Sequence, residues 1–209
     1  ETEKIFYLKN EEKFFTEDKT KVFIEKKYII DTKNLVFLPN QNLLFSEEKT
    51  TMDDSMRNNI YKLIDFKYLI DKEILKGSKV KILTSNKKSD GDIFFFENAF
   101  FNLKKNTFLA KDTKAKFHKT IFDNDKNDPR INSVATYGDE LNTYFDKAVF
   151  TSCKKTDKCP PWKITSKKIK HDKKKKQIIY KNAWLQLYDI PVVYFPKFFH
   201  PDPSVKRQS

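Results

Sequence analysis

The dominant pattern along the chain is an alternation of apolar and polar residues. Phe66, Tyr68 and Ile70 alternate with residues of the opposite face, and the alternation resumes at Leu75 after a polar turn at residues 71–73. A period of two is typical of β-strands that bury one face. The pattern therefore predicts a hairpin with one apolar face.

The same hairpin pattern recurs farther along the chain. In a second copy, Phe101 and Phe108 take the positions of Tyr68 and Leu75, with a turn at residues 104–106. A third copy surrounds the Lys-rich turn HDKKKKQ at residues 171–177, and a weaker copy of the pattern begins at Tyr28. Repeated units that cannot bury their apolar faces alone must stack on neighbours. We therefore predict a long antiparallel sheet folded over on itself.

Few segments depart from this pattern. Residues 51–59 (TMDDSMRNN) are predicted to form a short helix or loop, and residues 85–92 and 122–130 are predicted loops because they are rich in Asn and Asp. The repeats run through most of the chain, so we expect one domain over residues 1–209.

The alternation leaves two arrangements open for the apolar faces. If the layers of the sheet meet, these faces pack against each other as the core of a sandwich. If the layers splay apart, the same residues line an apolar trough that could hold acyl chains. The period of two is compatible with both arrangements.

The composition and charge of the chain limit the kinds of partner that it can bind. The chain has 42 Lys and Arg against 29 Asp and Glu, a net charge of +13. Only Arg57, Arg130 and Arg207 are arginines, although base edges and phosphates favour the guanidinium fork. The lysines are spread along the chain, which favours a solvated surface over a nucleic-acid site. Three glycines are too few for a nucleotide-binding loop.

Candidate chemistry is sparse. His118, His171 and His200 are far apart and belong to no catalytic motif, so we expect no enzyme activity, no metal and no cofactor. Cys153 and Cys159 are spaced more widely than a usual zinc half-site, although His171 lies downstream. A disulfide in an oxidising compartment is favoured, and zinc or free thiols remain the alternatives.

The C-terminal segment has a distinctive order of motifs. A Cys-containing loop ends in PPWKI, the hairpin KKIKHDKKKKQIIYKNAWL follows, and then come IPVVYFP and FFHPDPSVKRQS. This order, over residues 150–209, resembles the periplasmic region of the lipopolysaccharide-assembly family LptD (OstA), most closely its alphaproteobacterial branch. The repeat over residues 61–149 is similar to the OstA-like repeat, although this signal is less specific than the C-terminal motifs. Residues 1–60 match the family only in pattern.

The resemblance implies an all-β fold, an open antiparallel β-jellyroll or β-taco built from repeated hairpins, whose interior receives the acyl chains of lipopolysaccharide. The chain would be a conduit and not an enzyme. The alternative is a structural or adhesion-type β module with a filled core and no lipid cargo. The repeat phase and the exit segment then assign the predicted lipid-binding residues: Tyr68, Ile70, Leu75, Val80, Ile82, Phe101, Leu103, Phe108, Phe117, Ile178, Tyr180, Leu185, Leu187, Val193 and Phe195.

Partners and location also follow from the resemblance. An LptA-like bridge protein would add a strand to a sheet edge and deliver lipid. The chain's own C-terminal barrel, with an LptE-like lipoprotein, would receive the lipid at the outer membrane, which places this domain in the periplasm. Family cysteines link this domain to the barrel, so the resemblance leaves open whether Cys153 and Cys159 pair with each other.

Residues 190–209 are the predicted exit segment that leads to this missing barrel. Proline cannot donate a hydrogen bond to a sheet, so the segment is predicted to be an edge strand that gives way to an extended linker. Phe198 and Phe199 would cover the end of the trough, and Lys206 and Arg207 would lie at the membrane surface. The prolines predicted to interrupt the ladder are Pro191, Pro196, Pro201 and Pro203.

Overall fold

The computed structural model describes residues 1–25, 27–84, 91–117, 128–154, 160–202 and 205. They form one antiparallel sheet with two short 3-10 helices, η1 (Lys9–Glu11) and η2 (Pro39–Gln41). The strands of the N-terminal part are short: β1 (Ile5–Leu8), β2 (Lys13–Thr16), β3 (Lys19–Ile24), β4 (Tyr28–Lys33), β5 (Val36–Leu38), β6 (Leu43–Ser46) and β7 (Thr50–Asp54). Those that follow are long: β8 (Asn59–Leu69), β9 (Ile74–Thr84), β10 (Ile93–Asn102), β11 (Thr107–Lys116), β12 (Arg130–Gly138), β13 (Asn142–Thr151), β14 (Trp162–Asp172), β15 (Gln177–Leu187) and β16 (Ile190–Pro201).

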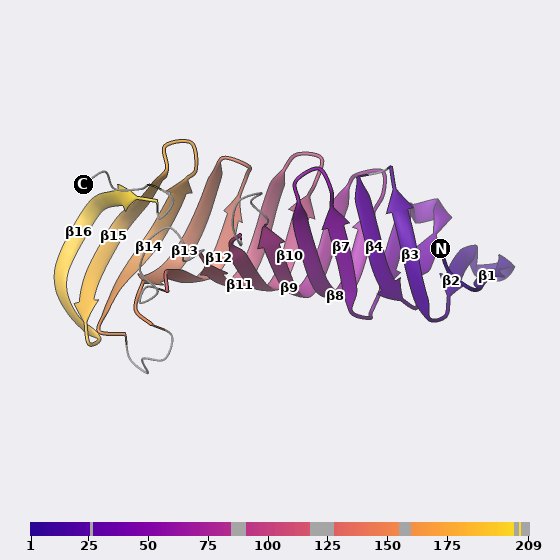
Figure 1. Ribbon diagram of the computed structural model, residues 1–209, viewed down its shortest axis with the longest axis horizontal. Coiled ribbons are helices and arrows are strands. Elements are labelled where there is room, and N and C mark those ends of the chain that lie inside the picture. Colours follow the sequence, from indigo (N-terminus) through magenta and orange to yellow (C-terminus); the bar gives the residue numbers. More distant parts are fainter. Residues whose placement is uncertain (26, 85–90, 118–127, 155–159, 203–204, 206–209) are drawn as a thin grey trace.

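The sheet is open and elongated, with β1 and β16 at opposite ends (Figure 1). From β8 to β16 each strand pairs with the next one in sequence. Toward the N-terminus the sheet divides, because one half of β8 pairs with β7 and the other half with β6. One branch continues through β4 to β3, and the other through β5 and β2 to β1. This arrangement is the open jellyroll or taco architecture that the sequence predicts.

The long strands share a row of skipped pairing positions near their middles, which we call the crease. The registers from β9 to β16 each omit one pair along this row, except that the β10–β11 register omits two. Four strands place a non-glycine residue with positive φ there: Lys79, Asp112, Lys147 and Asn182. Such a residue inserts a local bend into a strand. The crease therefore folds the two halves of each strand toward one another.

The crease also explains which side chains face inward. Tyr180 and Ala183 are both fully buried, three positions apart across Asn182. Elsewhere in β15 the buried residues are two apart, so the extra residue keeps the apolar side inside on both halves. Small buried residues lie beside the crease, where the layers are closest: Ala99, Ala110, Thr113, Ser133, Thr136, Ala148, Ser166 and Ala183.

Most predicted hairpins are confirmed. Pairs β8–β9, β10–β11 and β14–β15 have turns at residues 70–73, 103–106 and 173–176. The helix or loop predicted for residues 51–59 is wrong for residues 51–54, which belong to β7 with Thr50, Met52 and Asp54 inward, whereas residues 55–58 form a turn, as the loop alternative predicts. Residues 85–90 and 122–127 of the two predicted loops lie outside the described part of the chain.

The crease can be tested at Lys147, whose φ of 48° is costly for any L-residue other than glycine. We expect Lys147→Gly to leave the free energy of unfolding unchanged within about 0.5 kcal/mol or to raise it, since glycine adopts this φ freely. Lys147→Val should lower it by about 1 to 2 kcal/mol. Lys111→Gly, at a regular exposed position of β11, is the control and should lose about 0.5 to 1 kcal/mol in urea unfolding. Equal losses for both glycine variants would contradict the crease.

Candidate lipid-binding interior and its mouth

The interior between the two layers contains two clusters of buried apolar side chains. The first extends from Tyr28 to Ala110 and the second from Ala115 to Ala183. Phe94 packs against both clusters. The apolar interior is therefore continuous along the described sheet.

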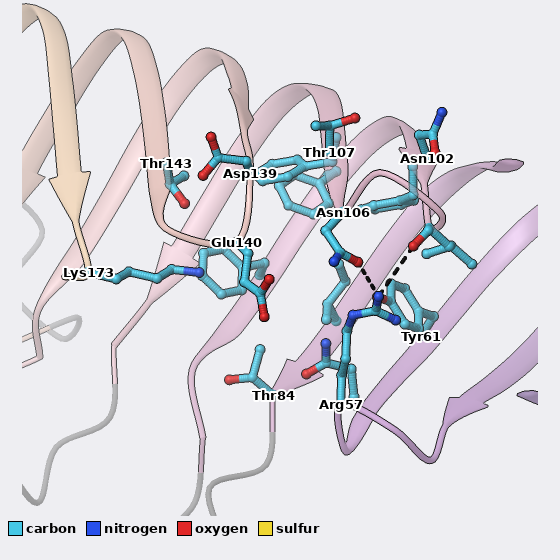
Figure 2. Close-up of a pocket in the computed structure, with 17 residues that line it drawn as sticks. Arg57, Tyr61, Thr84, Asn102, Asn106, Thr107, Asp139, Glu140, Thr143 and Lys173 are labelled. Carbon is cyan, nitrogen blue, oxygen red and sulfur yellow. Dashed lines mark hydrogen bonds between the residues drawn. The ribbon is translucent and has the colours of Figure 1, made fainter. Parts of the chain in front are cut away.

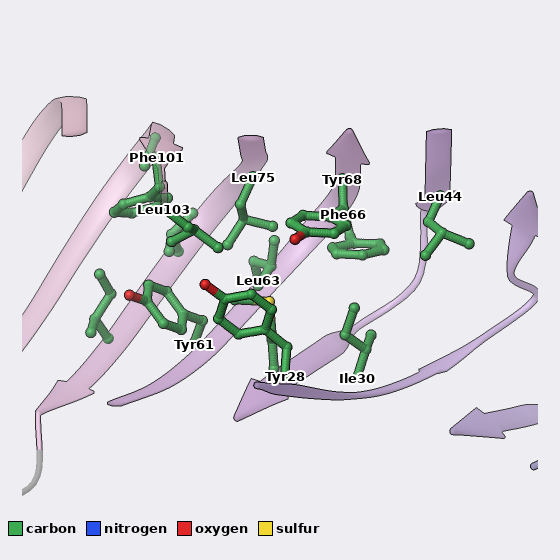
Figure 3. Close-up of a cluster of buried hydrophobic side chains, with 14 of the residues drawn as sticks. Tyr28, Ile30, Leu44, Tyr61, Leu63, Phe66, Tyr68, Leu75, Phe101 and Leu103 are labelled. Carbon is green, nitrogen blue, oxygen red and sulfur yellow. The ribbon is translucent and has the colours of Figure 1, made fainter. Parts of the chain in front are cut away.

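In the N-terminal half the interior is filled by side chains of the protein itself. Rings from one layer meet rings from the other: in Figure 3 Tyr28 and Tyr61 lie on one side of the interior, and Tyr68 and Phe101 lie on the other. Tyr28 packs edge-on against Tyr68 with centroids 6.2 Å apart, and Tyr61 packs against Phe101 at 5.5 Å. Burial raises the pKa of the Tyr61 hydroxyl to about 12. In this conformation the layers meet as a packed core.

One buried polar group in this core has no hydrogen-bond partner. Tyr68 is fully buried, and no partner exists for its hydroxyl among the described residues. Burial raises its pKa, with a smaller contribution from Tyr28. A buried hydroxyl without a partner costs about 1 to 3 kcal/mol. The packing around Tyr68 is therefore not optimal for a core alone.

The side of the taco opposite the crease is its mouth, which has two margins. We call them the turn lip, at residues 70–73, 103–106, 139–141 and 173–176, and the loop lip, which includes Glu25, Lys27, residues 55–58 and Thr84. Backbone hydrogen bonds join neighbouring segments of the turn lip, such as Leu103 N to Glu73 O at 2.8 Å. Such bonds join residues 73 and 103 and residues 141 and 173, on either side of the interval between the turns at 103–106 and 139–141.

A hollow with a volume of about 190 Å³ opens at the mouth (Figure 2). Its floor is aromatic and includes Tyr61, Phe94, Phe96, Phe101 and Phe108. Its rim is polar and carries charges of both signs: Arg57, Asn59, Thr84, Asn102, Asn106, Thr107, Asp139, Glu140, Thr143 and Lys173. An apolar floor below a polar rim suits the end of an amphipathic molecule.

Among the described residues, polar side chains join the two lips at two places. Arg57, from the loop lip, donates from Nη2 to the Leu103 carbonyl oxygen at 3.3 Å and to Asn106 Oδ1. Farther along the mouth, Glu73 of the turn lip accepts from Lys27 Nζ and the Tyr28 hydroxyl, each at 3.4 Å. The mouth is therefore held by polar side-chain contacts, whereas the crease is continuous backbone.

The structure places the predicted lipid-binding residues in three environments. Ile82, Phe101, Leu103 and Phe108 line the hollow. Leu187 and Val193 are 45% and 42% exposed, so the expectation that these two lie in the interior is not met; they flank the β15–β16 turn at the end of the sheet. Buried or half-buried within the two clusters are Tyr68, Ile70, Leu75, Val80, Phe117, Ile178, Tyr180, Leu185 and Phe195.

The predicted exit segment is an edge strand, as expected, since β16 pairs only with β15. The predicted interruption of the ladder is met only in part, because β16 continues to Pro201 while its register shifts between Leu185 and Gln186, the partner of Pro191. Pro191 and Pro201 pair with Gln186 and Gln177, while Pro196 lies at the crease position that the register skips. One side of an edge strand has no partner, so it tolerates prolines.

Two polar contacts anchor the end of β16. His200 Nδ1 donates to the Pro201 carbonyl oxygen at 2.7 Å, so Nε2 of the neutral ring accepts from the Tyr180 hydroxyl at 2.9 Å. Beyond the strand, Asp202 Oδ2 and Nε2 of the buried His171 are joined by a hydrogen bond. The HPDP motif therefore ties the exit segment to the last hairpin. Pro203, Lys206 and Arg207 lie outside the described residues.

The aromatic residues of the exit segment differ in environment. Phe198 stacks on Tyr180 with centroids 4.5 Å apart, whereas Phe199 is 60% exposed. Phe198 thus packs against the second cluster at the end of the sheet, whereas the expectation that Phe199 also covers the interior is not met, because Phe199 lies on the opposite face of β16.

The cysteine pairing stays a prediction. Cys153 is buried, and its thiol lies 3.6 Å from the Trp162 carbonyl oxygen. Cys159 lies outside the described residues. Among the described residues, no group of His, Cys, Asp and Glu could hold a metal ion, and no helix is long and apolar enough to cross a membrane.

The sequence did not reveal the chemistry of the outer face. Lysines lie over outward-facing rings: Lys76 over Phe100, Lys81 and Lys116 over Phe95, and Lys168 over Tyr137, at 5.4 to 5.8 Å from the ring centroids. Cation–π contacts of this kind shield aromatic surface from water. Many lysines therefore cover the outer face of the sheet.

In the comparisons with known proteins, no family model and no curated protein matches this chain. The resemblance inferred from the C-terminal motifs therefore has no support beyond those motifs and the architecture.

The anchor at His200 predicts a pH dependence of stability. Burial lowers the pKa of His200 below its ordinary value of 6.5. The unfolded chain then binds a proton that the folded chain excludes, so stability is complete above pH 6.5 and falls as the pH falls below it. The slope should be at most about 1.4 kcal/mol per pH unit. His200→Gln should flatten this part of the profile in urea unfolding between pH 5 and 7. Identical profiles for the two proteins would exclude His200 as the cause.

The two phenylalanines of the exit segment are expected to contribute differently to the free energy of unfolding. Phe198→Ser should lower the free energy of unfolding by about 2 kcal/mol, because it removes the stacking on Tyr180. Phe199→Ser, the matched control on the exposed face, should change it by less than about 0.5 kcal/mol. Thermal or urea unfolding of the two variants makes the comparison, and equal losses would contradict this assignment of faces.

Proposed function

We propose that this chain is a lipid-binding conduit that holds the acyl chains of lipopolysaccharide between its two layers. The observation that carries the proposal is the asymmetry of the fold. One margin of the interior is a crease of continuous backbone, whereas the other is a mouth joined by side-chain contacts such as Arg57 to Asn106. Opening at the mouth exposes the aromatic interior without breaking the β-ladder. A conduit that loads lipid from the side needs this property.

The interior supports the same proposal. It is apolar along the described sheet, and a hollow already opens between the lips over Phe101 and Phe108. The unpartnered hydroxyl of Tyr68 shows that the closed packing has a cost. At about 190 Å³ the hollow is small, so a multi-chain lipid requires the layers to separate.

The two ends of the sheet support transfer along the axis. At the N-terminal end, β1 is exposed along its whole length, with Ile5 66% and Tyr7 52% exposed. At the other end β16 exposes Ile190 and Val192. An exposed apolar edge strand is a template for strand addition. On this proposal a bridge protein of similar fold pairs with one end, and a membrane-embedded part of the same protein follows β16.

The second candidate is a β module with a filled core, favoured by the packed aromatic contacts between Tyr28 and Tyr68. The two functions differ in whether a ligand reaches the interior. No catalytic role is proposed.

Site-specific photo-crosslinking distinguishes them. A photoreactive residue at Phe101, which faces the hollow, should capture lipopolysaccharide. The matched control is Phe100, its neighbour in β10, which faces outward under Lys76 and should capture little. Electrophoresis with detection of the lipid measures capture. Equal capture from both positions, or none from Phe101, would favour the filled-core module.

A further inference from the structure

Arg57 has two halves with different partners. Nη1 pairs with Asp54 Oδ2 at 2.9 Å, and the Asp54 side chain is fully buried. The other carboxylate oxygen of Asp54 accepts from the backbone N–H groups of Met56 and Arg57 at 3.1 Å. This half of the guanidinium is therefore built into the turn between β7 and β8.

The other half crosses the mouth. Nη2 donates to the Leu103 carbonyl oxygen and Asn106 Oδ1, which both belong to the turn lip and are both neutral. A charged acceptor forms a hydrogen bond roughly twice as strong as a neutral one. The Arg57 side chain is 32% exposed and borders the hollow, so an anion can reach it. The hydrogen bonds that Nη2 makes across the mouth are thus the ones that an anion can replace.

We propose that Arg57 is a clasp that a phosphate group displaces: the phosphate takes Nη2 from Leu103 and Asn106, frees the turn lip, and leaves Nη1 on Asp54. This inference rests on the proposed function, since it assigns the phosphorylated end of the lipid to the Arg57 end of the mouth. It names the ligand class as a phosphorylated amphiphile.

The rim favours this orientation. At the other end of the hollow, Asp139 and Glu140 lie near Lys173 (Figure 2), so two carboxylates face one cation there and the net charge is unfavourable for an anion. Asp139 accepts from the backbone N–H groups of Leu141 and Asn142 at 2.8 Å, and these bonds lower its pKa and keep it charged. The acyl end of the ligand lies over the aromatic floor next to Arg57. The phosphorylated head and the acyl tail of the ligand thus match adjacent parts of the hollow.

The experiment measures the separation of the lips directly. Spin labels at Met56→Cys and Lys105→Cys, both exposed positions on opposite lips, report the distance in a protein with Cys153→Ser and Cys159→Ser. Lipopolysaccharide and the same lipopolysaccharide after dephosphorylation are the probes. The phosphorylated form should shift the distance peak to longer values, and the dephosphorylated form should shift it less.

A matched pair of variants tests the clasp without ligand. Asn106→Gly removes the side-chain acceptor of the Arg57 hydrogen bond, and glycine tolerates the φ of 53° at this position. It should lengthen the Met56–Lys105 distance in the absence of lipid. Asn42→Gly, in the equivalent turn with a φ of 47°, should leave it as in the wild type. Arg57→Gln should also open the mouth but leaves Asp54 without its partner, so Asn106→Gly is the cleaner variant.

The outcomes separate the two proposals. Capture of lipopolysaccharide at Phe101 with an unchanged lip distance would overturn the clasp and leave the conduit standing. Absence of capture would overturn both. Equal shifts with both forms of the lipid would overturn displacement by phosphate. A wild-type distance in Asn106→Gly would show that Asn106 does not hold the lips together.

Discussion

The structure depends on one backbone constraint, the bend that each long strand makes at the crease. Residues such as Asp112 and Lys147 adopt a left-handed conformation there, and the pairing register skips the same row from strand to strand. A single bent strand would be strained and unsupported. Aligned bends let the whole sheet fold over as a unit while pairing continues on both sides. Small side chains beside the crease follow from this geometry, because the layers are closest there.

The same constraint makes the two sides of the interior unequal. The crease cannot open without disrupting β-pairing, whereas the mouth is joined by side chains such as Arg57, Lys27 and Glu73. In the N-terminal part the constraint is met differently, because the chain breaks into shorter strands at Asp18 and Asn34, where φ is again positive. The taco shape therefore continues from bent strands into divided ones.

The sequence predicts the hairpins well where apolar residues fill the inward positions. The sequence also carries a signal for the crease. Inward-facing positions are normally two residues apart, but they are three apart from Gly77 to Val80 and from Tyr180 to Ala183. The hairpin β12–β13 was not predicted, since hydroxyl residues such as Ser133 and Thr136 occupy inward positions and weaken the alternation.

The clasp could not have been predicted in this way. Arg57 and Asn106 are 49 residues apart and meet only because two turns of different hairpins face each other across the mouth. No local pattern marks such a pair.

On the proposed mechanism, opening of the mouth couples the two ends of the ligand. The N-terminal part of the mouth is held by Glu73, so on this proposal separation begins in the described stretch between Arg57 and Lys173. Release of Arg57 alone exposes aromatic surface to water at a cost of about 25 cal/mol per Å². An acyl chain alone covers that surface but leaves the cross-lip bonds intact. A molecule with both a phosphate and an acyl chain removes both barriers, which makes entry selective for an amphiphile.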